Sequence, residues 1–149
     1  MNYLYKTHCV YTFEEYKRFS WVLYKKAYVL FVVLFCSFML IAAYVLKNTA
    51  FYIIAAAAPF IEAFIQNKKI KKTYLSNTVV HNLNIEFEFY DSFFVKKNEI
   101  GETKIPYNKL NKIIETKTNF YLMIANNQGF MLVKNNFPEG LEDFLRNIK

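Results

Sequence analysis

Residues 27–46 read AYVLFVVLFCSFMLIAAYVL and contain no charged side chain. Twenty residues of α-helix rise ~30 Å, which matches the thickness of the hydrocarbon core of a bilayer. Residues 50–67 form a second apolar run with one charged residue, Glu62. Because only residues 47–49 separate the two runs, the sequence predicts two antiparallel transmembrane helices, with Thr49 as the N-cap of the second.

A signal peptide and a soluble helical hairpin both fit this sequence less well. A secretory signal peptide has an apolar core of about 7–15 residues near the N-terminus. The run at 27–46 is longer and follows twenty-six residues that have a pattern of their own. A buried helical hairpin in a soluble protein would need a large covering shell. A chain of 149 residues, of which 54% are hydrophobic, cannot easily supply that shell.

The net charge of +7 arises beside the two apolar runs. Residues 1–26 carry five basic and two acidic side chains, residues 67–73 carry four lysines, and residues 74–149 carry nine of each sign. Because positively charged flanks stay in the cytoplasm, the sequence predicts a multi-pass protein of the inner (cytoplasmic) membrane with both termini cytoplasmic. A neutral folded domain offers no basic face, so no nucleic-acid partner is predicted. Anionic lipid would attract the cluster after the second run, which consists of Lys68, Lys69, Lys71 and Lys72.

The sequence pattern changes at Leu83 to an alternation with a period of two residues. Apolar Leu83, Ile85, Phe87 and Phe89 alternate with polar residues, which is typical of a strand with one buried face. Turn signals separate further short apolar runs, which predict strands at 93–97, 104–107, 112–116, 119–125 and 130–133. A helix should follow, capped by Asn136, with an apolar stripe formed by Leu141, Phe144, Leu145 and Ile148.

About six antiparallel strands followed by one helix favour a pleckstrin-homology-like (PH-like) barrel, whose C-terminal helix closes an open end. Such a barrel has seven strands, and either Tyr74–Val80 or Tyr3–Tyr11 could supply the missing one. Thr12 and Glu15 have the spacing of a capping box, which predicts a helix that continues into the first membrane helix.

The predicted fold class is therefore an α+β membrane protein. It consists of a two-helix transmembrane hairpin and a small antiparallel β, PH-like cytoplasmic domain with a C-terminal helix. The predicted parts are an N-terminal cytoplasmic strand and helix (1–26), two transmembrane helices (27–46 and 50–67) and the PH-like domain (74–149).

The segment from Ile105 to Phe137 reads IPYNKLNKIIETKTNFYLMIANNQGFMLVKNNF, and YTFEEY precedes the first apolar run. Together with the two adjacent apolar runs, these segments resemble the YcxB-like family of small bacterial membrane proteins. The chain departs from the family pattern at Val133, where a proline is usual before the lysine. The resemblance implies a PH-like cytoplasmic domain on a membrane hairpin, and it implies no reaction.

The sequence shows none of the motifs that carry catalysis or bind cofactors. Its three glycines form no phosphate-binding loop, and no Ser-His-Asp arrangement has a supporting motif. His8 and His81 stand alone, and Cys9 and Cys36 are too far apart in the predicted topology to form a disulfide. We therefore expect no enzyme, no cofactor and no metal. Two neighbouring lysines are candidates for contact with a lipid headgroup, namely Lys96 and Lys97.

Glu62 is the only carboxyl in the predicted membrane segments. Folding the hairpin about Asn48 places it level with Leu34, ~10 Å inside the membrane, with Ser37 as its candidate partner. A bare carboxylate at that depth costs about 3 kcal/mol. Three interpretations remain open. A neutral carboxyl pins the hairpin, the carboxyl contacts a second membrane protein or another copy, or helix tilt lifts it to the headgroups.

These features favour a membrane-anchored, non-enzymatic scaffold or adaptor at the inner face of a bacterial membrane. Its PH-like domain would bind a protein partner, and self-association is left open. Two alternatives remain: an immunity-type or accessory protein whose hairpin packs against another integral membrane protein, and a reader of lipid headgroups.

Overall fold

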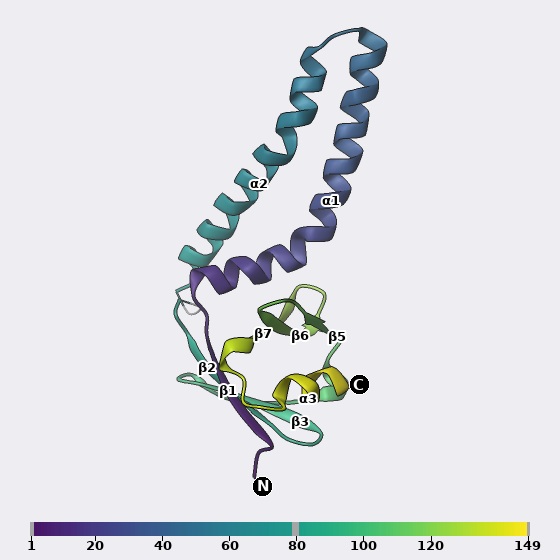
Figure 1. The fold of residues 1–149 in the computed structure, drawn as a ribbon. Helices are drawn as coiled ribbons and strands as arrows, with labels where there is room; N and C mark the ends of the chain where they lie inside the picture. The colour runs from purple at the N-terminus through teal and green to yellow at the C-terminus, as the bar shows by residue number, and fades with distance from the viewer. Residues whose placement is uncertain (1, 79–80, 149) are drawn as a thin grey trace. The chain divides into compact units, whose positions relative to one another are not determined.

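The structure is a computed structural model that describes residues 2–78 and 81–148. The chain has an α+β fold and divides into two compact units. The β unit contains residues 1–19 and 78–149, and the hairpin unit contains residues 20–77. Figure 1 shows how helix α1 (Phe13–Leu46) begins in the β unit and continues into the hairpin unit.

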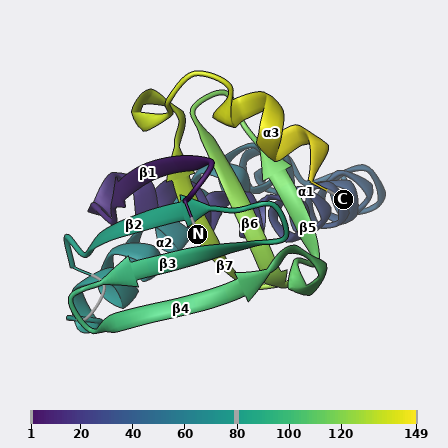
Figure 2. The same cartoon turned by 90° about the horizontal axis from the view of Figure 1, so that it is seen from below.

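The β unit contains two antiparallel sheets and a short C-terminal helix. The first sheet has the order β1-β2-β3-β4, and the second has the order β5-β6-β7. In Figure 2 the strands of the second sheet cross those of the first at a steep angle, with α3 (Leu141–Asn147) beside β5. The strands are β1 (Tyr5–Val10), β2 (Asn84–Phe89), β3 (Phe93–Asn98), β4 (Gly101–Pro106), β5 (Lys112–Glu115), β6 (Asn119–Ala125) and β7 (Gln128–Val133).

The N-terminal segment supplies the seventh strand. Strand β1 pairs antiparallel with β2 along its whole length, from Tyr5 opposite Phe89 to Val10 opposite Asn84. The other candidate was Tyr74–Val80, but its first residues lie in helix α2 (Ala50–Ser76), and Val79 and Val80 lie outside the described residues. The first sheet therefore depends on a strand that precedes the hairpin in the sequence.

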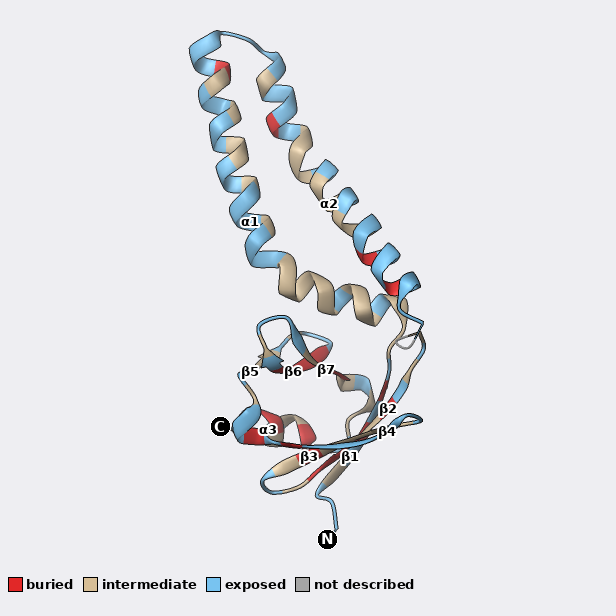
Figure 3. Cartoon of the chain, turned by 180° about the vertical axis from the view of Figure 1, so that it is seen from behind, coloured by how far each residue is buried: buried red, intermediate tan, exposed pale blue. Residues whose placement is uncertain are grey.

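The predicted buried face of β2 is confirmed, although Glu88 on the opposite face is also buried. Ile85, Phe87 and Phe89 are all buried, and Leu83, just before the strand, is half-buried. The ring of Phe87 lies 6.3 Å from that of Phe94 and 6.1 Å from that of Phe130. Figure 3 shows further buried positions on β6 and α3. The core side chains contributed by the second sheet and α3 are Phe120, Tyr121, Leu122, Met123, Met131, Leu132, Leu141 and Leu145.

The first turns of α1 pack on the second sheet. The Thr12 hydroxyl accepts a hydrogen bond from the Glu15 amide at 3.3 Å, as the capping box predicts. The Glu15 carboxylate does not return to the Thr12 amide. It accepts from the buried amide group of Asn119 at 2.5 Å and from Arg18 at 2.6 Å. Phe19 lies against Tyr121, with ring centroids 5.4 Å apart.

Two predicted helix caps are wrong. Thr49 precedes α2 but makes no side-chain capping bond, because the amides of Phe51 and Tyr52 donate to the backbone carbonyls of Asn48 and Thr49 instead. Asn136 lies in a 3-10 turn and binds β1 instead, donating to the His8 carbonyl at 2.9 Å. Gly140 occupies the N-cap of α3 with φ of 84°, in the left-handed region that favours glycine.

The hairpin unit consists of α1 and α2 as antiparallel neighbours joined by a short loop (Figure 1). By length and composition, both helices are long and apolar enough to cross a membrane. Their large side chains are mostly exposed, as the pale-blue ribbon in Figure 3 shows. The exposed fraction is 64% for Phe38 and 77% for Phe60. The buried positions in the upper hairpin are small, Ala43 and Ala55.

Candidate functional site

The Glu62 carboxylate is hydrogen-bonded to a tyrosine at the base of the hairpin. Its Oε1 accepts from the Tyr24 hydroxyl at 2.6 Å. Two neighbouring hydrogen bonds show the same alignment of α1 with α2. Trp21 donates to Asn67 at 3.0 Å, and Tyr28 donates to the Pro59 carbonyl at 2.9 Å. The lower hairpin is therefore held by three aromatic side chains of α1 that reach polar groups of α2.

This register corrects the predicted position of Glu62. The carboxyl contacts Tyr24, three residues before the uncharged run 27–46, rather than a residue level with Leu34. No hydrogen bond joins Glu62 and Ser37 in the part of the chain that the structure describes. The prediction folded the hairpin about Asn48, so that it paired residues equally distant from the loop on the two helices. A tyrosine side chain instead reaches across from a more distant turn, which satisfies the carboxylate near the end of the apolar run.

Cys36 satisfies a backbone carbonyl that Pro59 leaves without its helical donor. Proline has no amide hydrogen, so Pro59 cannot donate to the carbonyl of Ala55, four residues earlier. The Cys36 thiol of the facing helix donates to that carbonyl, with Sγ 3.3 Å from the oxygen. Ala55 is buried and has a small side chain, which allows this close approach. Cys36 thus links the two helices in the middle of the hairpin.

Replacing Cys36 tests this link. Cys36→Ala should destabilise the hairpin by about 1 kcal/mol, because it leaves an apolar-facing carbonyl without a donor. Cys36→Ser keeps a donor at the same position and should retain the stability of the original protein. Unfolding of the full chain from detergent micelles by sodium dodecyl sulfate, followed by circular dichroism, measures the difference. Equal stability of the alanine and serine variants would contradict the assignment.

The candidate lipid-facing lysines lie on two separate parts of the fold. Lys68, Lys69, Lys71 and Lys72 all lie on α2, and the Lys68 ammonium is 4.6 Å from the centroid of the Phe64 ring. Lys96 and Lys97 are neighbours on β3 and therefore point to opposite faces of the sheet.

Those opposite faces give Lys96 and Lys97 different partners. Lys97 forms an ion pair with Glu88 at 2.7 Å, which lowers the pKa of that carboxyl and raises the pKa of Lys97. The Lys96 ammonium lies 5.9 Å from the centroid of the Phe130 ring. The two lysines therefore do not form one site for a headgroup.

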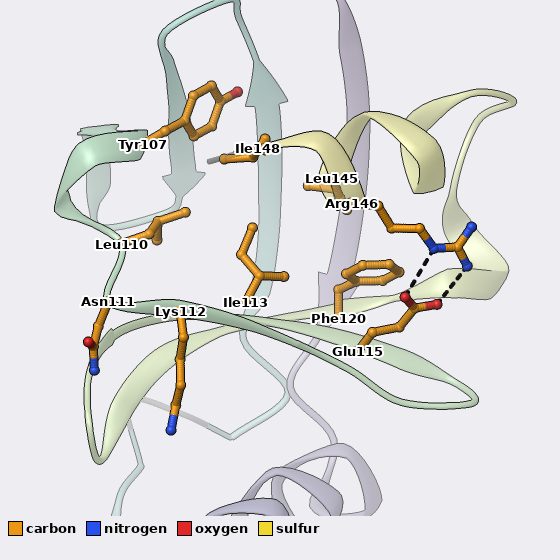
Figure 4. A pocket seen from close by; sticks show the side chains of 10 residues that line it. All are labelled: Tyr107, Leu110, Asn111, Lys112, Ile113, Glu115, Phe120, Leu145, Arg146 and Ile148. Atoms are coloured by element: carbon orange, nitrogen blue, oxygen red, sulfur yellow. Dashed lines mark hydrogen bonds and ion pairs between the residues drawn. The ribbon is translucent and has the colours of Figure 1, made fainter.

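A pocket of about 390 Å³ opens between β5 and α3 (Figure 4). We call it the β5–α3 groove. In the close-up, the Ile113 side chain points toward α3, whereas the Lys112 side chain points away from it. The apolar lining comes from both sides of the groove, and the polar residues lie toward its ends. The lining residues are Tyr107, Leu110, Asn111, Lys112, Ile113, Glu115, Phe120, Leu145, Arg146 and Ile148.

Ion pairs at one end of the groove hold α3 to the second sheet. The Glu115 carboxylate accepts from Arg146 at 2.7 and 3.0 Å, and it accepts from Lys134 at 2.6 Å. The Arg146 and Lys134 hydrogen bonds lower the pKa of Glu115 to about 2, from an ordinary value of 4.5. Because the three residues come from β5, α3 and the turn after β7, the cluster fixes the width of the groove.

Acid should weaken this cluster. A carboxyl whose folded-state pKa is lowered stabilises the fold above its unfolded value, and that stability is lost as the pH falls from 4.5 toward 2. Glu115→Gln should therefore show a smaller fall in thermal midpoint between these pH values than the original protein. Glu139→Gln, at an exposed position outside the cluster, is the matched control and should behave like the original. A parallel pH dependence for all three proteins would contradict this role of Glu115.

The groove was missed by sequence reasoning, although one signal was present. The run KIIE at 112–115 was predicted as a strand, but its position at a sheet edge depends on which strands pair. Within residues 2–78 and 81–148, no group of three or more His, Cys, Asp or Glu side chains could hold a metal ion. Burial raises the pKa of the Cys9 thiol to about 12, so this cysteine is not a reactive nucleophile.

Comparison with known protein families finds one match, to the family described as YcxB-like protein, over residues 89–148. The matched segment begins at the last residue of β2 and includes β3 to β7, the β5–α3 groove and α3. Searches of curated proteins and of solved structures found no match. The match supports the resemblance seen in the sequence, and residues 89–148 are similar to the YcxB-like family.

Proposed function

We propose that this protein is a membrane-anchored, non-enzymatic interaction module. In this proposal α1 and α2 cross the inner membrane of a bacterium, and the β unit is a PH-like domain that binds a protein partner in the cytoplasm. The observation that carries the proposal is the exposure of the hairpin's apolar side chains, including Leu30, Ile41 and Phe60 at 60–77%. A core helix of a soluble protein would bury such side chains, and exposed apolar surfaces of this size mark contact with lipid or protein.

The arrangement of the β unit supports a PH-like domain. Four and three antiparallel strands form two sheets that cross each other, and α3 lies beside the second sheet (Figure 2). This is the strand count and helix position expected for that barrel. Strand β1, which precedes the hairpin, pairs with β2, which follows it, so the proposal places both ends of the hairpin on the same side of the membrane.

Attachment to a membrane supports binding rather than catalysis. Tethering raises the local concentration of a domain near membrane-bound partners, so a modest intrinsic affinity is enough. The basic side chains that flank the hairpin on α1 and α2 suit a cytoplasmic surface with anionic lipid.

Crosslinking in native membranes, followed by mass spectrometry, tests this function. We expect reproducible crosslinks between partner proteins and exposed lysines of the β unit, such as Lys104, Lys109 and Lys112. The proposal would be overturned if no partner protein were crosslinked to the β unit above the background level.

A second candidate function rests on a depression in the hairpin surface. Its volume is about 320 Å³, and its lining is apolar apart from Glu62. A helix of another integral membrane protein could pack there, as an immunity-type or accessory protein requires. Partner contacts that map to the hairpin and disappear in Glu62→Leu would favour this second function. The lining residues are Phe31, Phe35, Ile53, Ile54, Ala57, Ala58, Ile61 and Glu62.

A further inference from the structure

Strand β5 has one unpaired edge. It is the terminal strand of the sheet β5-β6-β7, and among residues 2–78 and 81–148 it pairs with β6 alone. The Thr116 amide donates to the Asn119 carbonyl at 2.8 Å, which closes the β5–β6 turn. Hydrogen bonding alternates along an antiparallel strand, so every second residue before Thr116 bonds to β6 through its backbone. These residues are Ile114 and Lys112. The backbone amides and carbonyls of Ile113 and Glu115 therefore point to the open edge.

The same two residues contribute side chains to the β5–α3 groove. In Figure 4 Ile113 lies near Leu110 on one side and faces Leu145 of α3, and Ile148 just after that helix, on the other. A free row of backbone donors and acceptors thus runs beside a pocket that has apolar side chains between polar ends. These are the two features that β-strand addition uses, because main-chain bonds give affinity and pockets for alternate side chains give specificity.

The charges around the groove indicate the partner's character. Arg146 is already paired with Glu115, Glu142 and Asp143. Lys109, Lys112 and Lys117 lie before, on and after β5, and all three are exposed. None of the three forms an ion pair with another residue of the segments 2–78 and 81–148. An incoming segment with acidic side chains would complement these lysines.

We propose that the β5–α3 groove binds an extended peptide segment of a partner protein by adding a strand to β5. Apolar side chains at alternate positions of the peptide enter the groove, and acidic side chains face Lys109, Lys112 and Lys117. This inference rests on the proposed interaction function and names the surface and the chemistry of the partner.

The test uses the full chain in nanodiscs of phosphatidylcholine, a neutral lipid that does not compete for the lysines. The probes are dodecapeptides selected from a phage-displayed random library and then synthesised. We expect enrichment of peptides with alternating apolar residues and flanking Asp or Glu. Hydrogen exchange should show new protection of the Ile113 and Glu115 amides when such a peptide binds.

Ile113→Pro removes an edge donor without removing a ladder bond to β6, a position where strands tolerate proline. It should weaken peptide binding about tenfold, whereas Ile113→Val should leave it nearly unchanged. Circular dichroism checks that both variants fold. Should Ile113→Pro not fold, Lys112→Glu tests the same site, because it should weaken acidic peptides and reduce the salt dependence of their binding.

Three results would overturn the inference: no peptide enriched above background, no protection at Ile113 and Glu115, or unchanged affinity in the folded variants. A peptide that binds elsewhere on the β unit would reject the groove and leave the interaction module standing. Absence of any partner crosslinked to the β unit, by contrast, would reject the proposed function itself.

Discussion

Fragment 78–149, produced without residues 1–19, is expected to remain unfolded. Strand β1 covers the whole edge of β2, and its Thr7 and Cys9 side chains are buried in the core. Tyr5 also packs on Phe144 of α3, with ring centroids 5.2 Å apart. Removing these contacts exposes one edge of the sheet and its apolar face to water. The loss is comparable with the ~5–15 kcal/mol that stabilises a typical domain.

The first turns of α1 add to this dependence. Without residues 13–19, the buried Asn119 loses its Glu15 partner and Tyr121 loses the covering ring of Phe19. Circular dichroism and the amide dispersion of a nuclear magnetic resonance spectrum distinguish folded from unfolded fragments. The matched control joins residues 1–19 to 78–149 through a flexible Gly/Ser linker, and this fusion should fold. Cooperative unfolding of 78–149 alone would contradict the role assigned to β1.

Phe87→Asp should abolish folding of the β unit in the full chain. Phe87 is fully buried, and its ring contacts those of Phe94 and Phe130. The substitution removes about 2 kcal/mol of apolar burial and places a charge among buried aromatic side chains. Losses above about 4–5 kcal/mol are exceptional for single substitutions, and burying a charge in the core is one of the causes.

Limited proteolysis of the full chain in detergent, compared across variants, measures this effect. Phe87→Asp should make the β unit rapidly degradable, whereas Phe87→Leu should retain most of the resistance. Thr103→Asp places the same charge at an exposed position on β4 and should behave like the original protein. Resistance of Phe87→Asp equal to that of Thr103→Asp would show that the register of β2 is wrong.

Local patterns predicted most elements of this fold. The alternation of Ile85, Phe87 and Phe89 and the turn signals between strands depend on neighbouring residues alone, so β2 to β7 lie within a few residues of their predicted positions. The stripe on the C-terminal helix is also confirmed, because Leu141 and Leu145 are buried. These features need no knowledge of which segments meet in space.

Contacts between segments far apart in the sequence could not be predicted in the same way. Whether β1 or the residues before β2 complete the sheet depends on pairing across the whole intervening hairpin. The partner of Glu62 depends on the reach of the Tyr24 side chain, which spacing along the helices does not reveal. Asn136 resembles a helix cap in sequence, yet its side chain donates to the His8 carbonyl of β1 and its own carbonyl accepts from the Thr7 hydroxyl. The β5–α3 groove likewise arises from β5 being an edge strand.

The central claim is that the hairpin crosses the membrane while the β unit stays in the cytoplasm, and cysteine accessibility tests it most directly. The background protein carries Cys9→Ala and Cys36→Ser, which remove the two native thiols. Single cysteines are then placed at exposed Thr49, in the hairpin loop, and at exposed Glu139, before α3. A membrane-impermeant maleimide should label Thr49→Cys in intact cells and Glu139→Cys after permeabilisation alone. Labelling of Glu139→Cys in intact cells, or recovery of the protein from the soluble fraction, would contradict the claim.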